Sequence, residues 1–137
     1  MDAELENKLY EKYPQFFSNK DKGIMQSCMS MGIECGNGWY DLLNSICWEI
    51  QQKNKNIESQ NKYNPENNEK LLNFKFDQIK EKFGGLRVYY SGGDDYVRGL
   101  VDLAETMSYK ICEICGNKGE PNKNGWITTL CGSCRKS

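Results

Sequence analysis

Two Cys-x-x-Cys pairs near the end of the sequence constrain its structure more than any other feature. Cys112 and Cys115 form the first pair, Cys131 and Cys134 form the second, and fifteen residues separate the two pairs. This spacing is typical of a four-thiolate zinc site, in which each pair presents two sulfurs to a tetrahedral ion. A redox role for each pair is the alternative, but two pairs at this spacing favour Zn(II) as the cofactor. We therefore predict a zinc ribbon over residues 110–137.

The lack of histidine restricts the chemistry that this metal site can perform. The chain has 137 residues, seven cysteines and no histidine. Four thiolates close the coordination shell of zinc, whereas a catalytic zinc keeps one position open for water or substrate. Without histidine there is also no Ser-His-Asp or Cys-His arrangement. The sequence thus predicts a structural zinc ion in a protein that is not an enzyme.

Charge and hydropathy narrow the choice of partners. The 18 basic and 19 acidic residues leave a formal net charge of -1, which disfavours nonspecific nucleic-acid binding driven by electrostatic attraction. Trp126 could stack on a base, but an aromatic residue in a ribbon strand more often packs. The sequence contains no long apolar run and begins without a signal-peptide pattern, so we expect an intracellular protein with no membrane partner.

Hydrophobic periodicity predicts two helices in the first half of the chain. Apolar residues recur one turn apart from Leu5 to Tyr13, and Pro14 ends the pattern. A second apolar helix face runs from Trp39 to Ile50, with Asn37 as its expected N-cap. Residues 51–68 are polar and rich in Asn and Lys, so we expect a mobile loop there.

The second half of the chain combines a hairpin with a third helix. Residues 69–83 fit either a helix or a strand, whereas apolar and polar residues alternate clearly from Leu86 to Tyr90. We favour a β-hairpin that turns near Gly84 and Gly85, followed by a helix capped by Asp94 or Asp95. The predicted fold class is α+β, with helices on a small antiparallel hairpin in residues 1–109 and the zinc ribbon in residues 110–137.

Two segments are candidate ligand-binding sites. Arg87 and Tyr89 share a strand face beside a glycine turn, which could hold a nucleotide through stacking and charged hydrogen bonds. In the second segment, the backbone N–H groups of Gly36 to Gly38 could receive an anion while Trp39 or Tyr40 covers a base. The alternatives are a hairpin whose polar face is solvated, and a flexible turn with Trp39 in the core. The candidate residues are Lys82, Gly84, Gly85, Arg87 and Tyr89 in the hairpin, and Trp39 and Tyr40 at the start of the second helix.

Several motifs together resemble a family of small uncharacterised proteins of tailed phages and prophages. They are "GIECGNGWYDLL", "KEKFGGLRVYYSGG", "CEICGNKGEP" and "GWITTLCGSC", which cover nearly the whole chain except the Asn/Lys-rich segment. The resemblance implies a phage accessory protein that acts in the cytoplasm of a host bacterium. With the near-zero charge and the missing histidine, it favours a non-catalytic protein that binds a host component. That component would be a nucleotide-type signal, as for an anti-defence protein, or a host protein. The alternative is a nucleic-acid-binding ribbon protein in phage transcription or DNA metabolism.

Overall fold

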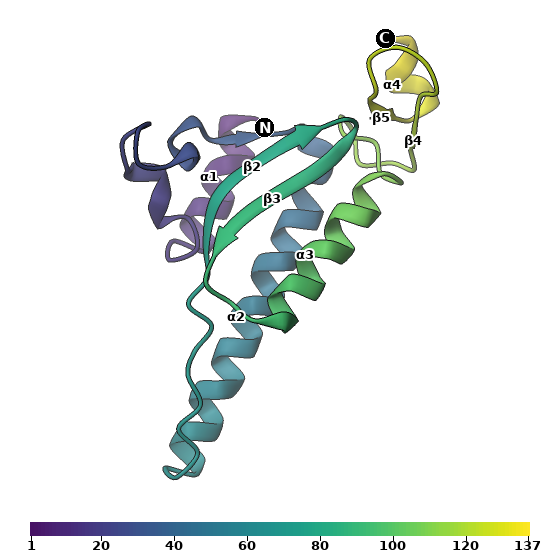
Figure 1. Cartoon of the computed structure of the whole chain (residues 1–137). Coiled ribbons are helices and arrows are strands. Elements are labelled where there is room, and N and C mark those ends of the chain that lie inside the picture. Colours follow the sequence, from purple (N-terminus) through teal and green to yellow (C-terminus); the bar gives the residue numbers. More distant parts are fainter.

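The structure confirms the predicted α+β fold, with three main helices packed around a β-hairpin. It is a computed structural model that describes all residues, 1–137. Figure 1 shows the hairpin lying across the helices, with residues 110–137, the cysteine module, beyond its tip. The main elements are α1 (Ala3–Lys12), α2 (Tyr40–Tyr63), β2 (Lys75–Lys82), β3 (Gly85–Ser91) and α3 (Asp95–Ser108). Residues 75–82 are therefore a strand, which resolves the choice between helix and strand for most of the ambiguous segment.

Shorter elements complete the fold. Strand β1 (Ile33–Glu34) pairs in parallel with β2, so the sheet has the order β1-β2-β3. This third strand was not predicted, because two residues are too short to give a periodic pattern. The remaining elements are the 3₁₀ turns η1 (Ser18–Asp21), η2 (Cys28–Met31) and η3 (Asn37–Trp39), and in the cysteine module β4 (Glu120–Pro121), β5 (Thr129–Leu130) and α4 (Gly132–Lys136).

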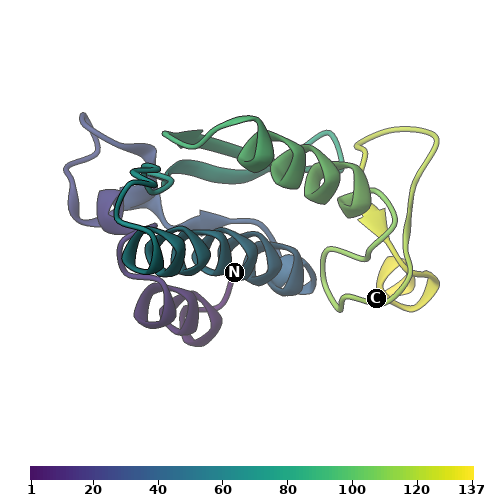
Figure 2. The ribbon, with the colours of Figure 1, turned by 90° about the horizontal axis from the view of Figure 1, so that it is seen from below.

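The hydrophobic core lies where the sheet, α1, α2 and α3 meet. Seen from below, α2 lies between α1 on one side and α3 with the hairpin on the other (Figure 2). The aromatic rings of Phe17 and Phe76 stack with their centroids 4.6 Å apart, which joins the segment after α1 to the sheet. The fully buried large side chains include Leu9, Tyr13, Phe17, Met29, Trp39, Leu43, Ile50, Phe76, Ile79, Leu86 and Val97.

Side chains of α3 cover the free edge of the sheet. The backbone N–H of Leu86 donates to the Oγ of Ser108 at 2.9 Å, and that of Val88 donates to the Glu105 carboxylate at 2.9 Å. An edge strand with unpaired N–H groups is open to pairing with other chains. The helix that Asp94 caps, by accepting from the Val97 N–H, thus also closes the outer edge of β3.

The predicted mobile loop at 51–68 is wrong for residues 51–63, which continue α2. Asparagine side chains order this segment: the amide of Asn54 both donates to the carbonyl of Leu72 (3.2 Å) and accepts from its N–H (2.7 Å). Asn61 makes the same pair of bonds with Glu69, at 2.8 and 3.2 Å. The distal half of α2 and the returning segment 64–74 thus form an arm that extends beyond the sheet (Figure 1). Composition could not predict that this segment is ordered, because it does not show which backbone groups the polar side chains bond.

The start of α2 also differs from the prediction. Asn37 is not the N-cap of α2, because the turn η3 precedes the helix. The N-cap residue of α2 is Trp39, and that of η3 is Gly36. The Asn37 side chain instead accepts from the backbone N–H of Asp2 at 2.8 Å and donates to the Asp2 carboxylate at 2.7 Å. The glycine-rich turn is therefore fixed to the N-terminal segment, and its own N–H groups are left for another acceptor.

Candidate metal centre and the surfaces around it

The four predicted cysteine ligands meet at one point. The sulfur atoms of Cys112, Cys115, Cys131 and Cys134 all lie within 4.8 Å of one another, and the Sγ atoms of Cys115 and Cys131 are 3.6 Å apart. Four sulfurs at about 2.3 Å from a tetrahedral zinc lie roughly 3.8 Å apart, so the cluster has the size that such a site requires. The residues present therefore fit one metal ion held by four thiolates.

Backbone N–H groups favour the thiolate form at two of these positions. Burial opposes ionisation of Cys112, but N–H groups of Cys115, Cys131 and Ile114 outweigh it and lower its pKa to about 6. The N–H of Cys134, which donates to the sulfur of Cys131 at 3.4 Å, lowers the pKa of Cys131. The hydrogen bond with the Cys131 sulfur raises the pKa of Cys134 to about 12. A cation is the natural means of keeping four such crowded sulfurs ionised together.

The first cysteine pair is bonded to the turn before α2. The N–H of Gly38 donates to the carbonyl of Glu113 at 2.7 Å, and the N–H of Gly36 donates to the Glu113 carboxylate at 3.0 Å. A Cβ atom on Gly38 would lie 2.0 Å from the Cys112 carbonyl oxygen, so only glycine permits this approach. The N–H groups that the sequence offered to an anion thus bind a carboxylate of the same chain, and burial raises the pKa of Glu113.

Trp39 also connects the turn before α2 to the start of the cysteine module, from the side of the hydrophobic core. Its side chain is fully buried, and its indole Nε1–H donates to the carbonyl of Ile111 at 2.9 Å. A buried indole needs such an acceptor, and here the acceptor directly precedes the first metal ligand. Trp39 therefore has no free face for a base. Neighbouring Tyr40 is half-buried and packs against the core cluster.

The second joint links the module to the tip of the hairpin. The buried Thr129 donates from Oγ1 to the carbonyl of Gly84 at 2.6 Å, and a Cβ on Gly84 would lie 2.9 Å from Ile127. The ring of Tyr109 covers Gly85 so closely that a Cβ there would lie 2.3 Å from it. Both glycines are therefore buried: Gly84 faces the module, and Gly85 faces the Tyr109 ring.

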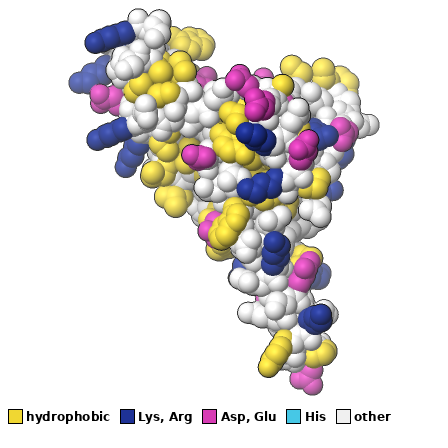
Figure 3. Space-filling view, turned by 180° about the vertical axis from the view of Figure 1, so that it is seen from behind, with side chains coloured by type: hydrophobic (Ala, Val, Ile, Leu, Met, Phe, Trp, Pro, Cys, Tyr) yellow, Lys and Arg dark blue, Asp and Glu magenta, His cyan; other side chains and the backbone are white.

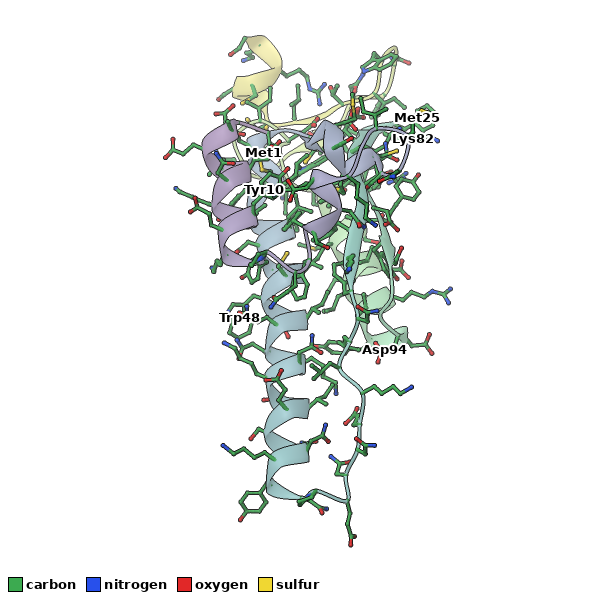
Figure 4. All side chains as sticks on the ribbon, turned by 90° about the vertical axis from the view of Figure 1, so that its left-hand side faces the viewer. Met1, Tyr10, Met25, Trp48, Lys82 and Asp94 are labelled. Atoms are coloured by element: carbon green, nitrogen blue, oxygen red, sulfur yellow. The ribbon has the colours of Figure 1, made fainter.

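The remaining ligand candidates of the hairpin have different neighbours, although Arg87 and Tyr89 alternate with the buried Leu86 and Val88 along β3. Arg87 donates to the Tyr109 hydroxyl at 2.8 Å, a bond that raises the pKa of the guanidinium, and also to the Leu86 carbonyl at 2.9 Å. Tyr89 is exposed and lines a hollow with Met25 and Asp77. Lys82 is exposed at the tip end of β2 (Figure 4). The nucleotide site predicted from these residues remains a prediction, and Arg87 in particular already has partners within the chain.

A groove between the hairpin tip and the module was missed by sequence reasoning. The expectation that Trp126 packs is wrong, because its side chain is 85% exposed. It lines a groove of about 370 Å³ with Phe83 and Ile127, and the other lining residues are Lys80, Glu81, Lys82 and Gly125. The two walls come from segments more than 40 residues apart, so no local sequence pattern reveals the groove. The only signal in the sequence was the aromatic side chain of Trp126, between the two cysteine pairs.

A second, apolar groove runs between α2 and α3. Its lining includes Leu42 and Ile46 from α2, and Leu100, Leu103 and Met107 from α3. Leu103 is 61% exposed, and hydrophobic side chains gather over this region in the view from behind (Figure 3). Surfaces of this kind commonly contact other proteins.

The three other cysteines are separate from the metal centre. Cys35 and Cys47 are buried, whereas Cys28 is exposed. Burial raises the pKa of the Cys35 thiol to about 12 and raises that of the Cys47 thiol as well. Cys47 lies on the apolar face of α2, within the hydrophobic core.

Comparison with protein-family models, with curated proteins and with solved structures finds no match for this chain. None of its helices combines the length and the apolar character needed to cross a membrane. The site must therefore be interpreted from its own geometry.

Proposed function

We propose that this chain is a zinc-stabilised, non-catalytic binding protein. The observation that carries the proposal is the closure of the metal site: four sulfurs gather around one point, and the flanking residues bond to the α+β domain. A four-thiolate shell leaves no position for substrate, and metal binding of this kind contributes folding free energy. The ion thus holds the module in the orientation that forms the groove beside it.

The proposed metal is zinc, and its identity can be tested directly. Elemental analysis of the purified chain should find one zinc per molecule, and Cys131→Ser should lower this content and the solubility together. The matched control is Cys28→Ser, since Cys28 is exposed and lies outside the cluster. Iron in place of zinc would contradict the identity of the metal, and equal metal loss in both variants would contradict the ligand set.

The proposed role is that of a phage accessory protein acting in the host cytoplasm on a host component. The resemblance to phage proteins supports the setting. The groove with exposed aromatic and lysine side chains supports a nucleotide-type ligand, as an anti-defence protein would sequester. The apolar groove between α2 and α3 supports a host protein as the second kind of target.

The alternative function is a nucleic-acid-binding ribbon protein, and one observation favours it. Trp126 is 85% exposed at the ribbon surface, where a base could stack on it. Against it stands the net charge of -1, which gives little long-range attraction for a polyanion. Binding measured over a range of salt concentrations separates the two, since nucleic-acid affinity falls much more steeply with salt.

A pulldown from bacterial lysate tests the binding role. The captured proteins and the small molecules released on heating should be identified by mass spectrometry. A non-catalytic binder should return its ligand with unchanged mass after prolonged incubation with excess protein. Conversion of the captured molecule into another compound would contradict the proposal, whereas recovery of an unaltered ligand would support it.

A further inference from the structure

Two exposed aromatic side chains face one groove, the tip groove, at the junction of the hairpin and the cysteine module. Trp126 is 85% exposed and Phe83 is 69% exposed, and both line the cavity of about 370 Å³. Scattered exposed apolar residues are ordinary, but two large rings on opposite walls of one groove form a surface that a flat ligand can cover.

Phe83 occupies a strained backbone position. It and Gly84 form the two-residue turn between β2 and β3, with φ of +54° and +81°. A turn with positive φ at both positions prefers Asn-Gly or Asp-Gly, and an aromatic residue at the first position is unfavourable. Its ring gains little from the chain's own packing, since most of it is exposed. An exposed ring at a strained position indicates that the side chain serves a contact outside the chain.

The opposite wall is held rigidly. The side chain of Asn122 donates to the carbonyls of Asn124 (2.6 Å) and Trp126 (2.9 Å) and accepts from the Thr128 N–H (2.7 Å). The Thr129–Gly84 hydrogen bond then locks this loop to the hairpin turn. Both rings are therefore presented by turns that need little further ordering, which favours binding.

The charges at the tip groove suit an anion. Lys80 and Lys82 line it, and neither takes part in the two ion pairs of the chain, Lys8–Glu4 and Lys20–Asp21. Glu81 is the acidic lining residue, and its carboxylate accepts from the Gly84 N–H at 2.7 Å. One carboxylate is thus engaged within the turn, while neither lysine has an anionic partner. The Lys82 ammonium lies over the Phe83 ring, 5.6 Å from its centroid, and can pair with a phosphate from there.

We propose that the tip groove binds a nucleotide unit, with its base against Trp126 and Phe83 and its phosphate toward Lys80 and Lys82. This inference rests on the proposed binding function and names the ligand chemistry and the place. Aromatic side chains accept any base by stacking, while lysines supply charge without a fixed geometry. The unit is either a free nucleotide or one nucleotide of a single strand.

Two probes distinguish these sources. Binding of adenosine 5′-monophosphate is followed by isothermal titration calorimetry, which does not need Trp126 as its reporter, and binding of a fluorescein-labelled eight-nucleotide oligothymidylate is followed by anisotropy. Binding of the mononucleotide supports a free-nucleotide site, and binding of the oligomer alone supports a single-strand site. Trp126→Ala should weaken the binding by about five- to a hundredfold, and Trp126→Phe by less, because a phenyl ring still stacks.

Matched controls are available for each substitution. Trp48 is 47% exposed and points outward from α2, on the side of the molecule opposite Lys82 (Figure 4), so Trp48→Ala should leave affinity unchanged. Lys82→Ala should reduce affinity and, for the oligomer, lower the salt slope by about 0.7. Lys62→Ala, which removes the same charge at the far end of α2, should do neither.

The proposal is overturned if neither probe binds, or if the Trp126 and Trp48 variants bind equally well. It is also overturned if Trp126→Ala abolishes capture of a host protein while no nucleotide binds. In these cases normal zinc content and an unaltered captured ligand would still support the proposed function. Loss of zinc, or conversion of the ligand, would instead contradict that function, so the two failures are distinguishable.

Discussion

The Oγ1 atom of Thr129 donates a 2.6 Å hydrogen bond to the carbonyl oxygen of Gly84, a residue 45 positions earlier in the chain. Both atoms are buried, and the bond joins the cysteine module to the turn of the hairpin. Thr129→Val keeps the shape of the side chain but leaves the carbonyl without its partner. We expect the free energy of unfolding to fall by about 1–3 kcal/mol, measured by chemical denaturation.

Thr129→Ser is the control for this prediction, since it keeps the hydroxyl and loses a methyl group. Zinc content should remain normal in both variants, because Thr129 is not a metal ligand. A valine variant as stable as the wild type would show that the bond adds nothing to the joint.

Gly85 tests the contact between the hairpin and Tyr109. A Cβ at Gly85 would lie 2.3 Å from the Tyr109 ring, so Gly85→Ala must displace the ring and should destabilise the fold by about 1–3 kcal/mol. Gly99→Ala is the opposite case: Gly99 is exposed in α3, and a Cβ added there would have no neighbour within 4 Å. Alanine there should stabilise the protein by about 0.5–1 kcal/mol. Thermal unfolding of the two variants should shift in opposite directions.

Asn54 tests the order of the arm formed by the distal half of α2 and residues 64–74. Asn54→Ala removes both hydrogen bonds to the backbone of Leu72, which should speed amide hydrogen exchange in this segment and destabilise it by about 1–2 kcal/mol. Asn56→Ala changes an exposed residue on the same helix and should leave exchange near Leu72 unchanged. Equal exchange in the two variants would contradict the role of Asn54.

Thiol reactivity tests the assignment of all seven cysteines. Four sulfurs belong to the metal cluster, and Cys35 and Cys47 are buried with raised pKa values, which leaves Cys28 as the reactive thiol. The folded metal-bound protein should therefore release about one equivalent of chromophore from Ellman's reagent, and Cys28→Ser should remove it. Chelation of the metal should expose further thiols. Rapid reaction of several thiols before chelation would contradict the closed cluster.

Local patterns predicted the elements of this fold well. The apolar spacing of α1, the alternation in β3 and the capping Asp94 all depend on residues close together in sequence. The clustering of the four cysteines was also predictable, because a four-thiolate metal site requires fixed spacing within each pair. These signals survive in the structure because tertiary contacts reinforce them.

What the sequence did not reveal depends on contacts between distant segments. The arm is one example: Ile50, Asn54, Ile57 and Asn61 form a single stripe along α2, but two of its members bond to backbone instead of packing. Glu113 is another, because its carboxylate fills the anion position at Gly36 from 77 residues away. Neither pairing follows from composition or periodicity. Both the asparagine pairs and the Glu113–Gly36 hydrogen bond satisfy groups that have no partner close by in the sequence.

The asparagine pairs also determine how the arm can vary in length. Asn54 with Leu72 and Asn61 with Glu69 join the two sides of the arm like the rungs of a ladder, and the main hydrophobic cluster along α2 ends at Ile50. A deletion that removes one asparagine pair, and shortens α2 and the returning segment by the same distance along the arm, would shorten the arm and leave that cluster intact. The arm is thus a modular extension, and the reach of the protein on that side is set by the number of rungs.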